Sequence, residues 1–219
     1  PGMPVSFSMQ NKDARILDLA CGQCIGCRLE RSRQWAVRCV HEASMWEENC
    51  FITLTYSDEN VPWDGSLRKS DFQKFMKRLR KQNEPKKIRF FHCGEYGDKT
   101  NRPHYHALLF NHDFHDRELF SERGGVRAYR SDALENLWPF GHCTVGELNF
   151  ETAAYTARYC MKKVTGKGAD EIDPETGLKP YERLDIERGE IIDVQPEYVT
   201  MSLRPGIGRT WYEIGRASC

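Results

Sequence analysis

Two apolar runs joined by a short link, between residues 87 and 110, most restrict the fold of this chain. KIRFFHCGEYG at 87–97 and HYHALLF at 104–110 carry the aromatic and branched residues typical of β-strands. The link GDKTNRP is short enough for the two strands to pair as an antiparallel hairpin. The sequence therefore predicts a sheet in which these two strands are neighbours.

Further apolar patterns place strands and helices on both sides of this hairpin. β-type alternation marks 50–56 and 141–149, and apolar residues at helical spacing mark 27–47, 70–83, 131–138 and 150–166. Ser70 and Gln73 form a capping-box pattern for the second helix, and Gly166 is a natural end for the last. The stretch between the third and fourth strands is expected to be loop and helix. Because strands and helices mix without regular βαβ alternation, we expect an α+β fold with a central, mainly antiparallel β-sheet flanked by helices.

The length of 219 residues suits one main domain. We expect an N-terminal segment with a group of cysteines and a helix at 1–48, a core at 49–168, and a C-terminal part of the same domain at 169–219. This last part begins as an acidic excursion punctuated by Gly and Pro. It is expected to return as a peripheral strand within PEYVTMSLRPGIG.

Charge is balanced overall but unevenly distributed along the chain. Lys plus Arg and Asp plus Glu both number 32, which argues against a uniformly basic nucleic-acid binder. Residues 68–89, however, hold ten basic and two acidic residues, whereas 170–197 hold three basic and ten acidic ones. The basic run is either a solvated helix face or a surface that follows the phosphates of a nucleic acid.

No apolar run reaches the length that a membrane span needs, and the N-terminus lacks the basic-then-apolar pattern of a signal peptide. We therefore expect a soluble, intracellular protein with no membrane partner. The cysteine count is nine, and an odd number without a secretion signal favours reduced thiols, some of them on a metal.

Cys21, Cys24 and Cys27 form a CxxCxxC pattern within CGQCIGC. Thiolates at this spacing suit a structural zinc ion or an iron–sulfur cluster if a fourth ligand is available. The alternative is that the thiols are reduced and hold no metal. Three residues further along the chain are candidates for the fourth ligand: Cys39, His41 and Cys50.

The HYH run and the preceding strand predict a second metal site. Side chains alternate faces along a strand, so His104 and His106 share one face, and Glu95 on the paired strand can meet them there. Two imidazoles and one carboxylate suit a divalent ion with open positions, and Mn²⁺ tolerates imidazole better than Mg²⁺ does. Zinc also fits this ligand set. The alternative is a pair of polar residues on a solvated strand face beside a loop-edge carboxylate.

Tyr155 and Tyr159 are candidate nucleophiles because their spacing places both hydroxyls on one face of the last predicted helix. Each is followed three residues later by a cation, Arg158 or Lys162. A phenol with a pKa near 10 is a poor nucleophile unless a cation or a polarised substrate assists it. The alternative is that two aromatic residues at helical spacing simply pack in the core.

These motifs together resemble a known protein family. The order FITLTY, then Glu95 and HYH, then YTARYCMKK is similar to the HUH endonucleases, named for a His–hydrophobic–His motif. More narrowly, CGQCIGCRLERSRQWAVRCVHEA, HCGEYGDKTNRPHYHALLF, LWPFGHCTVG, AAYTARYCMKKVTG and YVTMSLRPGIG resemble the replication-initiation (Rep) proteins of gokushovirus-type microviruses, which are small single-stranded DNA phages. The resemblance covers most of residues 20–212. It implies an RRM-like or palm-like core and a role as a rolling-circle replication initiator.

The resemblance also implies a mechanism, which is metal-dependent, site-specific nicking and joining of single-stranded DNA with Mn²⁺ or Mg²⁺. A tyrosine attacks the scissile phosphodiester, keeps the 5′ phosphate covalently, and frees a 3′ hydroxyl for a polymerase. Two tyrosines permit a second transesterification that closes the replicated circle. The pattern Tyr-x-x-Lys favours Tyr159, with Lys162, as the initiator.

The implied partners are single-stranded origin DNA and the host polymerase and helicase, in the cytoplasm of an infected bacterium. Six basic residues are expected to contact DNA: Lys74, Lys77, Arg78, Lys81, Arg158 and Lys163. Two alternatives stay open, an HUH relaxase or transposase and a non-catalytic domain that binds single-stranded DNA. A covalent protein–DNA adduct distinguishes the enzymes from the binding domain.

Overall fold

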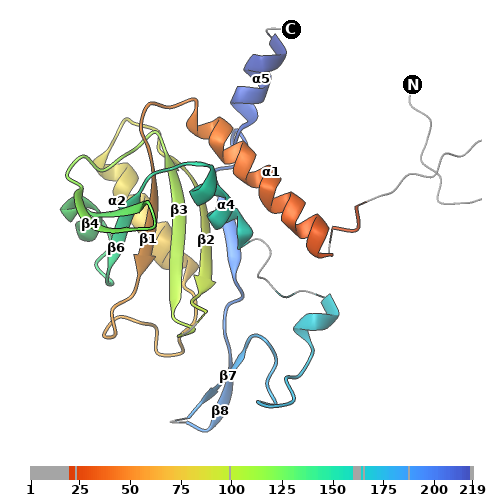
Figure 1. Ribbon diagram of the computed structural model, residues 1–219. Coiled ribbons are helices and arrows are strands. Elements are labelled where there is room, and N and C mark those ends of the chain that lie inside the picture. Colours follow the sequence, from red (N-terminus) through yellow and green to blue (C-terminus); the bar gives the residue numbers. More distant parts are fainter. Residues whose placement is uncertain are drawn as a thin grey trace, which may run out of the picture.

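A seven-stranded antiparallel sheet organises the chain (Figure 1). The computed structural model describes residues 20–22, 24–98, 100–159, 164, 166–186 and 188–217. The strand order is β4-β5-β6-β1-β3-β2-β9, and every neighbouring pair is antiparallel. The strands are β1 (Asn49–Thr55), β2 (Arg89–Tyr96), β3 (Pro103–Phe110), β4 (Glu118–Arg123), β5 (Val126–Arg130), β6 (Cys143–Gly146) and β9 (Tyr198–Met201). The predicted α+β class with an antiparallel sheet is confirmed.

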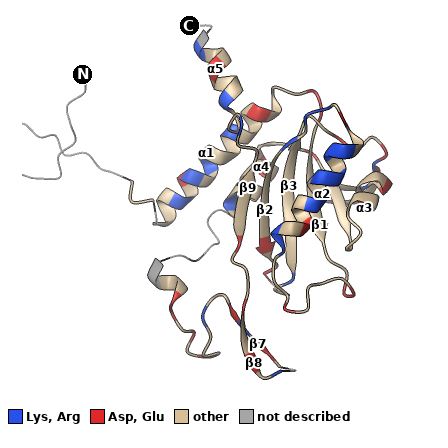
Figure 2. Cartoon of the chain, turned by 180° about the vertical axis from the view of Figure 1, so that it is seen from behind, with Lys and Arg blue, Asp and Glu red and all other residues tan. Residues whose placement is uncertain are grey.

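Helices cover both faces of the sheet. Two of them, α1 (Ile25–Ala43) and α4 (Phe150–Arg158), lie on one face, and α2 (Lys69–Gln82) and α3 (Asp132–Leu137) lie on the other (Figures 1 and 2). A fifth helix, α5 (Arg209–Ala217), contacts α1 near the C-terminus. None of the helices in the described part of the chain is both long and apolar enough to cross a membrane.

The alternation of β3 explains how the sheet acquires two cores. Tyr105 and Leu109 pack with the apolar side of α2, whereas Leu108 and Phe110 pack with α1 and α4. Both faces of β3 are therefore buried, which accounts for the nearly continuous apolar run of this strand. His106 belongs to the α1 and α4 side, because its ring contacts Tyr155 on α4.

The region between β3 and β6 differs from the prediction. It holds a β4–β5 hairpin before α3, where loop and helix were expected. Most side chains of both strands are exposed, so the strands carry no apolar period that the sequence could reveal. The one sequence feature that indicates this hairpin is the pair Gly124-Gly125, whose positive φ angles of 58° and 79° allow a two-residue turn.

The expected caps of two helices are wrong. Helix α2 begins with Arg68 as its N-cap and without a side-chain cap, because the Tyr105 hydroxyl bonds both the amide and the carbonyl of Arg68. Ser70 and Gln73 therefore form no capping box. Helix α4 runs from Phe150 to Arg158, and Gly166 lies in the short 3₁₀ helix η1 (Gly166–Ala169) instead of capping α4. Residues 160–163 and 165, which the expected helix includes, lie outside the described residues.

The C-terminal region returns to the sheet as expected. A separate two-stranded sheet, β7 (Glu182–Asp185) and β8 (Glu190–Asp193), occupies the acidic excursion. Strand β9 then pairs with β2 at the edge of the main sheet, which confirms the predicted peripheral strand. Helix α5 was not predicted, and its Trp211 stacks on His41 of α1 with ring centroids 3.5 Å apart.

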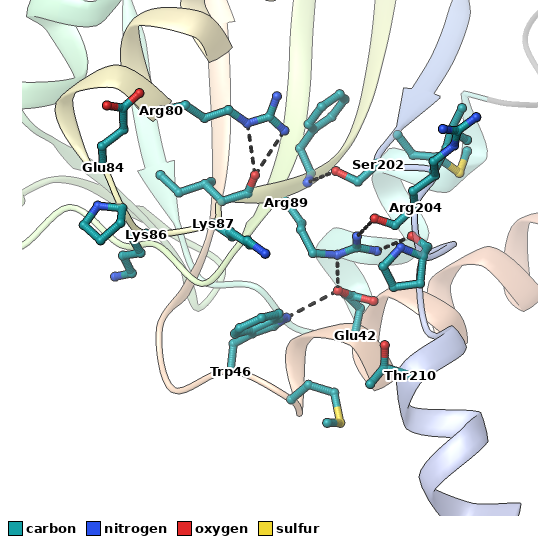
Figure 3. A pocket seen from close by; sticks show the side chains of 17 residues that line it. Glu42, Trp46, Arg80, Glu84, Lys86, Lys87, Arg89, Ser202, Arg204 and Thr210 are labelled. Carbon is teal, nitrogen blue, oxygen red and sulfur yellow. Dashed lines mark hydrogen bonds and ion pairs between the residues drawn. The ribbon is translucent and has the colours of Figure 1, made fainter.

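A buried ion pair joins α1 to β2 beside a pocket of about 1150 Å³ (Figure 3). The Glu42 carboxylate accepts hydrogen bonds from Arg89 Nε at 2.6 Å, from Trp46 Nε1 at 3.3 Å and from the Gly208 amide at 2.8 Å. Arg89 also donates to the carbonyl of Pro205 at 2.7 Å. The ion pair therefore binds the segment after β9, at Pro205 and Gly208, to the C-terminal part of α1.

Replacing Arg89 by methionine is expected to lower the free energy of unfolding by about 3–5 kcal/mol, because the nearly buried Glu42 carboxylate loses its counter-charge. Urea denaturation measures the loss. The matched control is Arg33→Met, which breaks an exposed pair with Glu30 and is expected to cost less than about 1 kcal/mol. Equal losses in the two variants would contradict a structural role for the Glu42–Arg89 pair.

Candidate metal centre and tyrosine pair

The β2–β3 hairpin brings together the three predicted metal ligands. Glu95 lies directly opposite His104 in the register, and His106 is two residues further along the same face. His104 Nε2 and His106 Nε2 lie 2.7 Å and 2.9 Å from the same oxygen, Glu95 Oε1. One ligand atom from each residue lies within 4.8 Å of the others. The predicted juxtaposition is confirmed, and the three side chains are called the Glu95 cluster below.

Contacts on the far side of each imidazole fix its orientation. His104 Nδ1 lies 3.1 Å from the carbonyl oxygen of Arg102, and His106 Nδ1 lies 3.0 Å from Thr53 Oγ1. A carbonyl can only accept, so His104 carries a proton on Nδ1. Metal-binding histidines commonly use the second nitrogen in this way while the first faces the ion. Both Nε2 atoms therefore point toward Glu95.

The charge of Glu95 follows from its surroundings. The side chain is 1% exposed, and burial alone would raise its pKa, but hydrogen bonds from His104 and His106 outweigh burial and lower the pKa to about 2. The carboxylate is thus ionised at neutral pH. A divalent cation bound by the three ligand atoms would take the place of the imidazole protons that face this carboxylate. The donor set therefore fits a divalent cation, and its two nitrogens favour Mn²⁺ or Zn²⁺ over Mg²⁺.

Both predicted tyrosines lie against His106. The Tyr155 hydroxyl is 3.5 Å from His106 Nε2, and the two rings meet edge-on with centroids 4.9 Å apart. The Tyr159 ring is stacked on the same imidazole at 5.7 Å. Helix α4 and its C-cap therefore place two phenols on one face beside the Glu95 cluster; their spacing predicted the shared face.

The two tyrosines differ in their access to solvent. Tyr155 is 38% exposed, whereas Tyr159 at the C-cap of α4 is 6% exposed. Burial, followed by the hydrogen bond with Tyr155, raises the pKa of Tyr159 well above its ordinary value. Arg158 is exposed in the last turn of α4, and Lys162 and Lys163 lie outside the described residues. Of the two phenols, Tyr155 is the one that a substrate can reach.

The basic helix α2 does not adjoin the Glu95 cluster. Lys74, Lys77 and Lys81 are exposed, but α2 covers the opposite face of the sheet from α1 and α4 (Figure 2). Arg78 donates two hydrogen bonds to the carbonyl of Leu137 and thereby ties α2 to α3. DNA contact by this helix stays a prediction, and Arg78 has an architectural role.

The cysteine cluster of Cys21, Cys24 and Cys27 lies at the start of α1, with its sulfur atoms within 4.8 Å of one another. The expectation that Cys39, His41 or Cys50 completes it is wrong. Cys39 lies about 18 Å beyond Cys27 along the axis of α1, because each helical residue adds about 1.5 Å. Cys39 and Cys50 are buried in the cores, and His41 stacks on Trp211 near the other end of α1.

Two residues of strand β1 that support His106 were not identified from sequence. Thr53 lies opposite His106 in the β1–β3 register, and Phe51 stacks on its ring at 5.6 Å. Thr53 and Phe51 alternate onto the same side of the run FITLTY, and that side could have been matched with the histidines of the HYH run. Using it requires knowledge that β1 pairs with β3 in this register.

Comparisons with known proteins place this geometry in a family. Residues 49–164 match the family Replication-associated protein ORF2/G2P, and this range includes the Glu95 cluster and both tyrosines. The replication-associated protein VP4 of Bdellovibrio phage phiMH2K is 37% identical over 163 residues, which are 70% of this chain and 51% of the relative. The replication-associated protein ORF2 of Spiroplasma virus 4 is 34% identical over 212 residues, which are 92% of this chain and 59% of the relative.

A further relative is the replication-associated protein ORF4 of Chlamydia phage 1, which is 37% identical over 154 residues, 66% of this chain and 38% of the relative. The chain thus spans about half the length of the curated relatives that it matches. No solved structure matches it. With more than half of its residues matched by the family, the chain belongs to the Replication-associated protein ORF2/G2P family.

Proposed function

We propose that this chain initiates rolling-circle replication of single-stranded phage DNA by cutting and rejoining one strand through a covalent phosphotyrosine. The observation that carries this proposal is the Tyr155 hydroxyl, 3.5 Å from His106 in a cluster that fits a divalent cation. Membership of a replication-associated family supports the same assignment. A nucleophile adjoining a cation site on one sheet face is the arrangement that phosphoryl transfer needs.

The chain's own residues divide the chemistry between binding and attack. Glu95, His104 and His106 would hold Mn²⁺ or Mg²⁺, which when bound polarises the scissile phosphate and offsets its developing charge. The Tyr155 oxygen attacks phosphorus and loses its proton to solvent, which reaches this partly exposed side chain. The bond from phosphorus to the 3′ oxygen breaks, and that oxygen takes a proton from solvent and leaves as a 3′ hydroxyl. The 5′ phosphate stays esterified to the tyrosine, so no water is consumed.

The tyrosines are assigned different steps. We take Tyr155 as the initiator, although the sequence pattern favoured Tyr159, because Tyr155 is the exposed phenol nearest His106. Tyr159 lies within ring contact of Tyr155, with centroids 5.1 Å apart. It serves as the second nucleophile, which cleaves the new junction while Tyr155 still holds the old strand. The released 3′ hydroxyl primes the host polymerase, with the host helicase opening the duplex.

Incubation with single-stranded origin DNA and Mn²⁺, followed by a denaturing gel and peptide mapping, tests the proposal. The expected product is a covalent adduct on a peptide that contains Tyr155, together with a fragment that ends in a 3′ hydroxyl. Binding without cleavage would identify a non-catalytic DNA-binding domain. Cleavage to a free 5′ phosphate without an adduct would identify a hydrolytic nuclease.

The exposed lysines of α2 yield a separate prediction about DNA affinity. Changing Lys74, Lys77 and Lys81 to Glu is expected to weaken binding to all single strands alike, because flexible ammonium groups contact phosphates without reading bases. Loss of three phosphate contacts lowers the slope of log affinity against log salt by about 2. Fluorescence anisotropy at several salt concentrations measures this slope.

The matched control reverses three exposed arginines of the β4–β5 hairpin, namely Arg123, Arg127 and Arg130, and so changes the net charge by the same amount. This control is expected to retain the wild-type slope. If both triple variants lose slope equally, the effect reflects net charge, and the lysines of α2 are only a solvated face.

A further inference from the structure

The cysteine cluster has an internal hydrogen-bond pattern that the proposed DNA chemistry does not use. The Cys24 amide donates to Cys21 Sγ at 3.2 Å, and the Cys27 amide donates to Cys24 Sγ at 3.5 Å. Cys21 Sγ and Cys27 Sγ are 3.8 Å apart. Two backbone amides of the cluster are thus directed at its sulfur atoms. Such bonds stabilise sulfur in its charged, metal-binding form.

The position of the cluster on α1 is a second, independent observation. Cys24 is the N-cap of this 19-residue helix, and Cys27 lies in its first turn. The first amides of a helix lack internal partners, and the helix dipole favours negative charge at this end. Cys21 and Cys24 are exposed, so an ion from solvent can reach them. The Cys27 amide lowers the pKa of Cys24, but hydrogen bonds with the neighbouring Cys21 and Cys27 thiols outweigh it and raise that pKa above its usual value. The site therefore offers three neighbouring sulfur donors whose thiols must lose their protons as an ion binds.

The first turns of α1 have little packing of their own. Ile25 is 71% exposed and Leu29 is 51% exposed, and the first buried residue of the helix is Ser32. In Figure 1 this end of α1 extends away from the sheet. A helix end without an apolar contact needs another source of stability. Ligation of its first turn supplies one.

We propose that Cys21, Cys24 and Cys27 bind one zinc ion through three thiolates. Tetrahedral Zn²⁺ with bonds of about 2.3 Å separates two sulfur ligands by about 3.8 Å. The observed Cys21–Cys27 separation is 3.8 Å. In a [4Fe–4S] cluster each thiolate binds a different iron atom, which requires wider spacing. The geometry therefore selects a single ion.

Binding is a ligand exchange that leaves all oxidation states unchanged. Each thiol gives its proton to solvent as its sulfur replaces a water molecule on the ion, so three protons are released per zinc. Among the described residues, no His, Asp or Glu joins the three sulfur atoms.

The ion would act through α1 on the tyrosine helix. Ala36 and Cys39 of α1 share a core with Ala153 and Ala157 of α4, the helix that carries Tyr155. Stabilising the start of α1 therefore supports the packing of α4. The zinc site lies outside the Glu95 cluster, and its occupancy is expected to be independent of the catalytic metal.

Elemental analysis of the purified full chain tests the site. Wild-type protein dialysed against Zn²⁺ and then against metal-free buffer is expected to retain about one zinc per chain. Cys24→Ser is expected to lose at least nine-tenths of it. The control Cys143→Ser, which changes a buried thiol on β6, is expected to keep it. His106→Ala is also expected to keep it, which separates this zinc from any ion on the Glu95 cluster.

Cobalt substitution then counts the sulfur ligands. Co²⁺-loaded protein is expected to show thiolate-to-metal charge transfer with the intensity of three thiolates, and this band disappears in Cys24→Ser. A disulfide between two of these cysteines in the purified protein before any reductant is added would overturn the proposal. Iron with acid-labile sulfide, or zinc that Cys24→Ser retains, would do the same. A second measurement does not depend on metal content. In metal-free protein, the amides of residues 25–31 are expected to exchange hydrogen faster, because the start of α1 is less stable.

Discussion

Replacement of Tyr155 by phenylalanine is expected to lower the rate of DNA cleavage by at least about a thousandfold and to abolish the covalent adduct. The variant lacks the oxygen that attacks phosphorus, and this loss cannot be compensated by binding elsewhere. Stability should change by less than about 1 kcal/mol, because the hydroxyl belongs to a partly exposed side chain. Single-turnover cleavage with Mn²⁺, a denaturing gel and a thermal melt measure these three quantities.

Two further variants locate the effect. Tyr159→Phe is expected to retain much of the first cleavage but to impair joining, since its buried phenol acts only after Tyr155 is esterified. Tyr212→Phe removes an exposed phenol on α5 and is expected to change neither step. If Tyr155→Phe cleaves normally while Tyr159→Phe fails, the roles are reversed. If both cleave normally, the tyrosines only pack on His106.

The sequence predicted the Glu95 cluster because only local rules were needed. A short link forces β2 and β3 to pair, and the alternation of side chains then places Glu95, His104 and His106 on one face. The tyrosine pair followed from helical spacing in the same way. Each inference used residues that are neighbours in one hairpin or in one helix.

What the sequence did not predict depends on contacts between distant segments. Thr53 supports His106 only because β1 pairs with β3 in one register among several that FITLTY permits. The start of α2 is set by the Tyr105 hydroxyl, which overrides the local capping pattern at Ser70. Spacing also cannot tell which sheet face a helix covers, so the basic α2 seemed as able as α4 to adjoin the site, although it lies on the opposite face.

Removal of the acidic metal ligand gives the second large effect. Glu95→Gln is expected to slow cleavage by about a hundredfold to ten-thousandfold at limiting Mn²⁺, because loss of several kcal/mol of charge stabilisation corresponds to that range. The amide keeps the shape of the side chain but not its charge. Isothermal titration with Mn²⁺ is expected to show weaker binding in parallel. Glu118→Gln on the exposed strand β4 is the matched control and should alter neither quantity.

The stability of Glu95→Gln separates metal binding from folding. Burial alone would raise the pKa of Glu95, but bonds from the two imidazoles lower it from 4.5 to about 2. A carboxylate with a lowered pKa stabilises the folded chain above about pH 4.5, and this contribution disappears as the pH falls toward 2. Urea denaturation should therefore show a deficit for Glu95→Gln at pH 7 that shrinks on acidification. If excess Mn²⁺ restores cleavage while the variant remains less stable than the wild type, the rate effect is assigned to the ion. Full activity of the variant in excess chelator would show instead that the Glu95 cluster is only a buried hydrogen-bond network.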